Sequence, residues 1–274
     1  MLPLQIGLLF LTDHLSSGVL HRPKHSRPVP EGKVEHAVGG VAAAVKGWHQ
    51  YCAQPVLPAS LAYVLLYFNA VLAPGGLMTS YLTQQGLPVA AIGVFRGVCA
   101  AMGFAATFVS APLIAATGVL KAGAVALLCQ SAALVLSVAV CLLMPAGNVV
   151  FLSLFLALVA LSRLGYWTYD CIDAQIFQTA IPGGEANLVG TTEVALQSLA
   201  EVVMLGIAIV VHDVAHFGVL SVISCAAVVA ATAIYCAWLA KPNADQKRLF
   251  PNEPQFRFGG KGLQPGLQPL VPSA

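Results

Sequence analysis

Six long apolar segments follow one another after residue 55 of this 274-residue chain. Roughly 20 apolar residues in a helix cover the hydrocarbon core of a bilayer, and each segment is at least that long. The segments are 56–82, 89–116, 119–144, 149–181, 188–211 and 217–240. Hydrophobic residues make up 58% of the chain and charged residues 9%, which excludes an ordinary soluble globular protein. The sequence therefore predicts an all-α polytopic membrane protein.

The first apolar segment contains a helix-breaking sequence at Pro74-Gly75-Gly76. Proline removes a backbone donor and glycine permits unusual backbone angles, so a kink or an unwound stretch is expected there. Backbone groups freed inside a membrane must bind protein or cavity water, and transporters often place interrupted helices at a substrate site. From the break alone, two interpretations stay open: a binding site, or a packing kink that binds nothing.

Basic residues gather at the two ends of the chain, in residues 13–50 and from Lys241 onward. Neither stretch keeps a long hydrophobic period, so we predict a polar linker at 13–50 and a disordered tail at 241–274. Because cytosolic loops carry the excess of Lys and Arg, both termini are expected in the cytosol. Residues 1–12 lack the basic start and cleavage site of a signal peptide, and they resemble the end of a longer membrane helix.

Enzyme and disulfide patterns are absent from the sequence. The seven cysteines show no CxxC spacing, and no GxSxG, HExxH or P-loop motif is present. An intramembrane aspartyl protease needs carboxylates from two facing helices, whereas Asp170 and Asp173 lie on one predicted helix. We therefore predict no enzyme, no disulfide framework, no bound cofactor and no nucleic-acid partner.

The fourth apolar segment carries charges that are costly in a membrane. Arg163, Trp167 and Asp170 recur at spacings of four and three, which places them on one helix face. Intramembrane charges tend to face a cavity or a partner. They could form a structural ion pair, between themselves or with a neighbouring helix, or a gate that breaks and reforms during transport.

The fifth apolar segment carries Glu193, Gln197, Glu201 and Met204 on one side. A carboxylate beside a thioether can hold a transition metal, the oxygen favouring harder ions and the sulfur softer ones. Methionine in an apolar helix more often fills space in the packing. Glu201 and Met204 are the candidate metal ligands, and Glu193 and Gln197 are candidate pathway residues.

Several stretches, taken in order, resemble the ferroportin family, the iron-exporting solute carriers of the major facilitator type. They are Gly47-Trp48, Val71–Thr79, Thr83–Leu87, Arg163–Asp170 and Glu193–Glu201. The Pro-Gly-x-Leu-Met-Thr form of the break is more similar to plant members than to animal ones. The resemblance extends over about residues 47–240.

Such carriers have two six-helix lobes that rock against each other around a midplane site. The resemblance implies that residues 51–240 form a C-terminal lobe, a half transporter with six transmembrane helices. It further implies an inter-lobe linker before the lobe, and a remnant of the preceding lobe's last helix at 1–12. The expected partners are the lipid bilayer and either the missing N-terminal lobe or a second half transporter.

The resemblance also implies a cargo of iron(II), with cobalt or nickel in some members. Animal members use a cysteine at the break and a histidine on the fifth helix, and those positions hold Gly76 and Met204 here. That site does not carry over, although Glu201 occupies an acidic position of the family. The expected metal site therefore consists of Glu201 and Met204. The expected pathway and gating residues are Pro74, Gly75, Gly76, Met78, Arg163, Trp167, Asp170, Glu193 and Gln197.

The predicted function is efflux of divalent metal, iron(II) first, by the C-terminal lobe of a ferroportin-like carrier. One alternative is a truncated, non-transporting lobe that acts as partner or regulator of an intact carrier. Another is an organic metal chelate or cation as cargo, recognised by the face of Arg163 and Asp170. Plasma membrane, vacuole and plastid envelope all stay open as locations.

Overall fold

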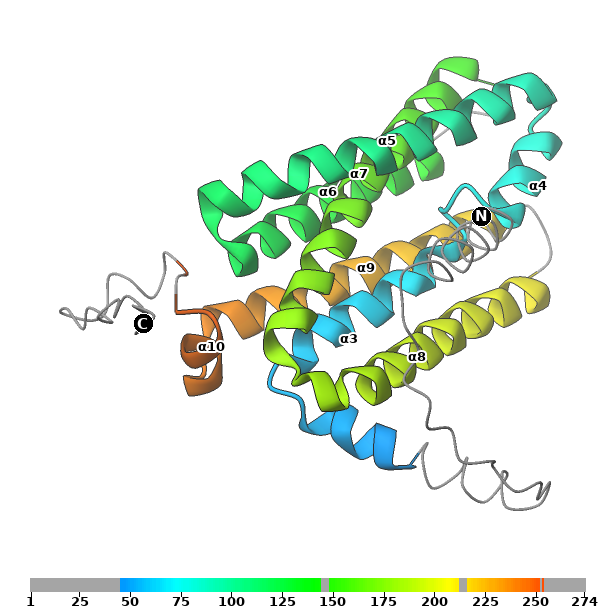
Figure 1. Cartoon of the computed structure of the whole chain (residues 1–274). Helices are drawn as coiled ribbons and strands as arrows, with labels where there is room; N and C mark the ends of the chain where they lie inside the picture. The colour runs from blue at the N-terminus through cyan, green and yellow to red at the C-terminus, as the bar shows by residue number, and fades with distance from the viewer. Residues whose placement is uncertain (1–44, 144–147, 212–215, 252, 254–274) are drawn as a thin grey trace, which may run out of the picture. The chain divides into compact units, whose positions relative to one another are not determined.

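The computed structural model describes residues 45–143, 148–211, 216–251 and 253, which belong to one compact unit. All regular structure in these residues is helical (Figure 1). After a helix at Val45–Ala53 come α3 (Leu57–Leu66), η1 (Tyr67–Ala70), α4 (Gly76–Gln84), α5 (Val89–Thr117), α6 (Val119–Leu143), α7 (Val149–Ala180), α8 (Gly183–Val210), α9 (Phe217–Ala240) and α10 (Ala244–Leu249). The predicted helix remnant at 1–12 and most of the predicted linker lie outside the described residues.

Five of the described helices, α5 to α9, are long and apolar enough to cross a membrane. The first predicted span is broken, as expected: η1 ends at Ala70, and α4 begins at Gly76. The non-helical stretch is therefore Val71–Gly75, slightly earlier than the Pro-Gly-Gly sequence alone indicated. The helix Val45–Ala53 and the stretch Leu57–Ala70 also meet at a bend of 114° around Pro55.

Two groups of helices make up the described bundle. Figure 1 shows α5, α6 and α7 side by side, with α3 lying between α9 and α8. Close packing of α6 on α7 depends on Gly165, where an added Cβ would lie 2.7 Å from the Ala126 carbonyl oxygen. Small residues let membrane helices approach closely, because lipid supplies little hydrophobic driving force between them.

The tail is not disordered along its whole length, so that part of the prediction is wrong for residues 244–251 and 253. Asn243 and Gln246 form a capping box that starts α10, and the Gln246 amide donates to the Trp238 carbonyl at 3.2 Å. Phe250 is buried, and the buried Glu253 carboxylate accepts the Leu120 N–H at 2.8 Å. The contact with Leu120 joins residues 133 positions apart, which the local composition does not reveal.

Candidate functional site around the broken helix

Backbone carbonyls freed by the helix break are satisfied by side chains from two other helices. The Arg163 guanidinium on α7 donates to the Leu72 carbonyl through Nη2 at 3.1 Å. The Ser224 hydroxyl on α9 donates to the Phe68 carbonyl at 2.9 Å. An unsatisfied carbonyl costs several kcal/mol in a membrane, so these two bonds stabilise the broken conformation.

The other side of the break is open within the described part of the chain. Gly75 has an extended backbone and accepts the Thr79 hydroxyl at 2.8 Å, which fixes the start of α4. An added Cβ at Gly75 or Gly76 would meet no described atom within 4 Å. Pro74 precedes this open stretch, while Met78 points into the core and is buried. The break is thus anchored on one side and free on the other.

The expected pairing between Arg163 and Asp170 is not what the structure shows. Among the described residues no ion pair joins them: Arg163 is buried with its guanidinium on the break, 5.5 Å from the centre of the Tyr166 ring. Asp170 instead accepts a hydrogen bond from the hydroxyl of Tyr63 on α3. The sequence did not predict this arrangement, because the positions of the Leu72 carbonyl and the Tyr63 phenol next to α7 are set by the tertiary structure. Neither contact is an ion pair: Arg163 bonds a backbone carbonyl of the break, and Asp170 bonds a neutral phenol.

Trp167 packs toward α5 rather than toward the break. An added Cβ at Gly103 would lie 3.0 Å from the Trp167 ring, so the indole covers this glycine closely. The ring of Tyr166 is perpendicular to it, with centroids 5.3 Å apart. Trp167 therefore contributes to the packing of α5 on α7.

Asp170 lies beside Tyr63 and Tyr166, which both interact with Tyr67, and the sequence analysis did not single out these three tyrosines. Tyr63 and Tyr67 have ring centroids 5.6 Å apart, and the phenols of Tyr63, Tyr67 and Tyr166 interact electrostatically with one another. Asp170 interacts with both Tyr63 and Tyr166, and all four side chains are partly exposed. The available signal was the spacing of four between Tyr63 and Tyr67, which places both hydroxyls on one helix face.

A second polar group joins α7 to α8. Asp173 and Glu193 are each 5% exposed, and their carboxyl groups are close enough to interact electrostatically. The Ser60 hydroxyl beside them donates to the Tyr51 hydroxyl at 3.0 Å. Gln197, one turn along α8, is also buried. The structure therefore brings two of the predicted pathway residues, Glu193 and Gln197, to one place.

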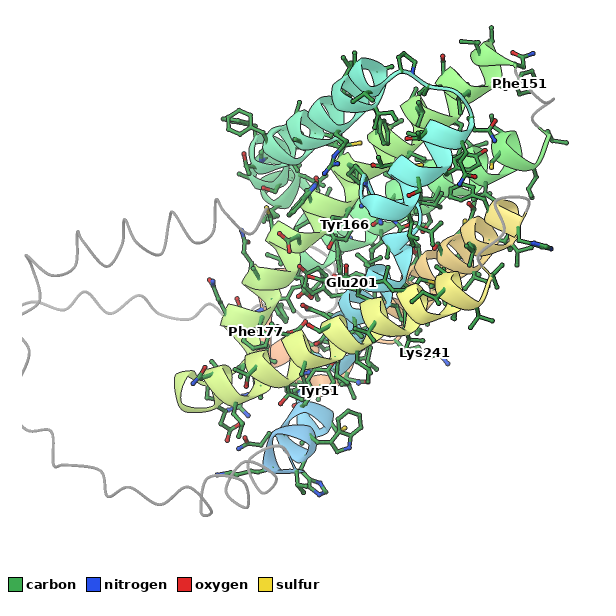
Figure 2. The ribbon with its side chains drawn as sticks, turned by 90° about the vertical axis from the view of Figure 1, so that its right-hand side faces the viewer. Tyr51, Phe151, Tyr166, Phe177, Glu201 and Lys241 are labelled. Atoms are coloured by element: carbon green, nitrogen blue, oxygen red, sulfur yellow. The ribbon has the colours of Figure 1, made fainter. Side chains whose placement is uncertain are left out.

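The candidate metal ligands Glu201 and Met204 lie in different surroundings. Met204 is fully buried in the hydrophobic core, whereas Glu201 is exposed on α8. Figure 2 labels Glu201 on α8 and Tyr166 on α7, two helices that diverge from their junction beyond Phe177. No group of three or more His, Cys, Asp or Glu side chains with metal-site geometry occurs in the described residues. A metal at Glu201 and Met204 stays a prediction.

The family model described as Ferroportin1 (FPN1) matches residues 22–228, well over half of the chain. The chain belongs to the ferroportin family. The suspected resemblance is thereby confirmed, and the ferroportin family is one of membrane transporters rather than a class of enzymes.

Two rice ferroportin relatives show how much of a family member the chain covers. Solute carrier family 40 member 2, chloroplastic, of Oryza sativa subsp. japonica is 44% identical over 80% of this chain and 37% of its own length. Solute carrier family 40 member 3, chloroplastic, of the same organism is 42% identical over 88% of this chain and 40% of its own length. The chain thus spans about two fifths of the length of these curated relatives.

A solved ferroportin-like structure confirms the fold. The crystal structure of a bacterial homologue of iron transporter ferroportin in the outward-facing state matches with a TM-score of 0.64 and 25% identity. The match covers 69% of this chain and 46% of that one. The predicted fold class, an all-α membrane protein of the major-facilitator half-transporter type, therefore agrees with the structure. This protein is an integral membrane protein.

Proposed function

We propose that this chain forms the C-terminal lobe of a ferroportin-like carrier that moves divalent metal out of a compartment, with iron(II) as the first candidate cargo. The observation that carries the proposal is the broken helix, whose Leu72 carbonyl is held by Arg163 while Gly75 and Gly76 border open space. An interrupted helix that lines a cavity is the usual place for a transporter's binding site. Membership in the ferroportin family supports metal as the cargo.

In this proposal the break is the element that a second lobe faces during alternating access. The anchored side, at Leu72 and Phe68, keeps the lobe rigid, so that the lobe moves as one body. The open side, at Gly75 and Gly76, offers backbone groups to the cargo. Glu201 is exposed on α8, where a second lobe could approach it. The partner is an N-terminal lobe or a second half transporter.

For the location we propose the plastid envelope ahead of plasma membrane and vacuole. The two rice relatives are named as chloroplastic, which supports this order. Both ends of the chain are expected on one side of the membrane, the cytosolic side by the distribution of Lys and Arg. A fluorescent fusion at the C-terminus, imaged against envelope and vacuole markers in plant cells, tests the location.

Transport in vesicles tests the function. The chain is reconstituted alone and together with the N-terminal lobe of the 44% identical rice relative, and uptake of radioactive iron(II), cobalt and nickel is measured. We expect flux only when both lobes are present, and more for iron(II) than for the other two metals. Absence of flux with both lobes, in vesicles where both are shown to be folded, would sink the transport proposal.

The alternative left open by the sequence, a non-transporting partner of an intact carrier, needs an experiment of its own. Under this alternative the chain alters the flux or the amount of a full-length relative that is produced in the same vesicles. Titrating the chain against a fixed amount of the rice relative separates the two functions. A change in the relative's flux without any flux from the paired lobes supports the partner function.

A further inference from the structure

The tyrosine–aspartate cluster, defined as Tyr63, Tyr67, Tyr166 and Asp170, gathers four oxygen-bearing side chains from three elements. Tyr63 comes from α3, Tyr67 from η1, and Tyr166 and Asp170 from α7. The Tyr63 hydroxyl donates to the Asp170 carboxylate, and Tyr166 interacts with both Tyr67 and Asp170. All four are partly exposed, so the cluster is not sealed inside the core.

The chemistry of these side chains favours a hard cation. A carboxylate and three phenols present only oxygen, the donor that hard ions such as manganese(II) prefer to the sulfur and nitrogen favoured by softer ions. The phenols are neutral when protonated, so they bind a metal through a lone pair and without losing a proton. Such a set binds weakly and releases easily, which a carrier needs.

The charges around the cluster also favour a cation. Asp170 interacts with Asp173 on the same helix, and Asp173 interacts with Glu193 on α8. Arg163 is the nearby cation, but its guanidinium is buried and bonded to the Leu72 carbonyl in the break. Because the break engages the Arg163 guanidinium, the Asp170 carboxyl pairs with no basic side chain among the described residues and is left to attract a divalent ion.

We propose that the tyrosine–aspartate cluster is a binding site for a hard divalent cation on the path of the cargo. The ion takes the carboxylate oxygen of Asp170 that now accepts the Tyr63 hydroxyl, and the Tyr63 hydroxyl turns to offer its lone pair. This site is different from Glu201 and Met204, whose side chains the described structure does not bring together. The statement that the bound ion is a transported cargo rests on the proposed function. The statement that the cluster binds a cation is independent of that function.

Terbium(III) luminescence tests the binding site without any transport. Terbium is a hard, oxygen-seeking ion whose emission rises when it lies close to an excited tyrosine. We expect saturable emission from the purified full chain in lipid nanodiscs, excited through its aromatic residues. Manganese(II) should displace the terbium at lower concentration than the softer cadmium(II) does. Displacement by cadmium at the lower concentration would overturn the hard-ion assignment.

Substitutions then locate the site. Asp170→Asn should weaken terbium binding by at least about tenfold, because a full charge beside the ion is lost. Asp170→Glu should retain most of the binding, which separates loss of the ligand from misfolding. Tyr63→Phe should weaken binding by about two- to tenfold, the worth of one polar contact. The matched control is Glu185→Gln, an exposed carboxylate in the first turn of α8, which should leave binding unchanged.

Two other results would overturn the proposal. If Asp173→Asn with Glu193→Gln abolished the signal while Asp170→Asn left it intact, the ion would belong to the buried carboxyl pair. If Glu201→Gln abolished it, the ion would belong to the site expected from the sequence. Failure of the proposed function looks different: terbium would bind at Asp170, and the paired lobes would carry no metal. Metal flux that Asp170→Asn does not change would overturn the place of the site on the cargo path and leave the transport function standing.

Discussion

Arg163 on α7 and Leu72 in the helix break are joined by a buried hydrogen bond of 3.1 Å from guanidinium to carbonyl. The two residues are 91 positions apart, so the fourth predicted span holds the first in its broken conformation. The arginine had been expected to interact with an acidic group. It instead satisfies a backbone acceptor that would otherwise have no partner in a membrane.

Arg163→Met should destabilise the folded chain by about 1–3 kcal/mol, because the buried Leu72 carbonyl loses its donor. Unfolding by sodium dodecyl sulfate, followed by circular dichroism, measures the change. The matched control is Arg96→Met, since Arg96 is an exposed arginine on α5, and little change is expected there. Equal effects of the two substitutions would show that the bond to Leu72 contributes nothing.

Ser224→Ala should cost about 1 kcal/mol of stability, since the Phe68 carbonyl at the break loses the hydroxyl that binds it. Ser221 offers a control on the same helix, because its equally buried hydroxyl donates within α9 to the Phe217 carbonyl. The Phe217 carbonyl lies in the same helix as Ser221 and not at the break. Ser221→Ala should therefore lower the stability by less than Ser224→Ala does. The same detergent titration of both variants checks the order, and a larger loss for Ser221→Ala contradicts the role given to Ser224.

Gly165→Ala should destabilise the packing of α6 on α7 by about 1–3 kcal/mol, because overpacking forces the backbones apart. The added Cβ would meet the Ala126 carbonyl at 2.7 Å, and a carbonyl cannot turn aside as a flexible side chain can. Gly206 on α8 is the matched control, since no described atom lies within 4 Å of its would-be Cβ. Gly206→Ala should be neutral or slightly stabilising in the same unfolding measurement.

Glu253 should make stability depend on pH. Burial raises the pKa of its carboxyl, and the N–H groups of Leu120 and Val119 and the nearby Lys121 offset this only in part. With a raised pKa the folded chain holds the proton more tightly than the unfolded chain does. The stability from this group is therefore fully present below the ordinary value of 4.5 and is lost as the pH rises through the raised value.

Glu253→Gln removes this titration and keeps an oxygen that can accept the Leu120 N–H. The Tm of the wild type minus that of the variant should therefore fall as the pH rises above 4.5. Melting curves of both proteins in detergent, taken from pH 4.5 upward, provide the measurement. A difference that stays constant, or that grows with pH, contradicts the effect of burial on Glu253.

Part of the fold was open to prediction because the signals are local. Apolar segments of membrane length predict spans wherever they occur, and α5 to α9 are found close to the predicted bounds. Pro74 and the two glycines after it predict a break from backbone chemistry alone. The order of the ferroportin motifs added the architecture of the lobe. The ordered part of the tail was not predicted, because Gln246 bonds Trp238 and Glu253 bonds Leu120, two residues that lie outside the tail.

By itself the sequence determined that the chain lies in a membrane as helices, that the first span is broken, and that it belongs with ferroportins. Only the tertiary structure decided which groups meet: Arg163 with a carbonyl of the break, Asp170 with Tyr63, and Glu193 with Asp173. Spacing along one helix places residues on a common face and says nothing about what faces them. In a membrane the groups that face a polar side chain decide its role, because every such side chain must find its partner inside the protein.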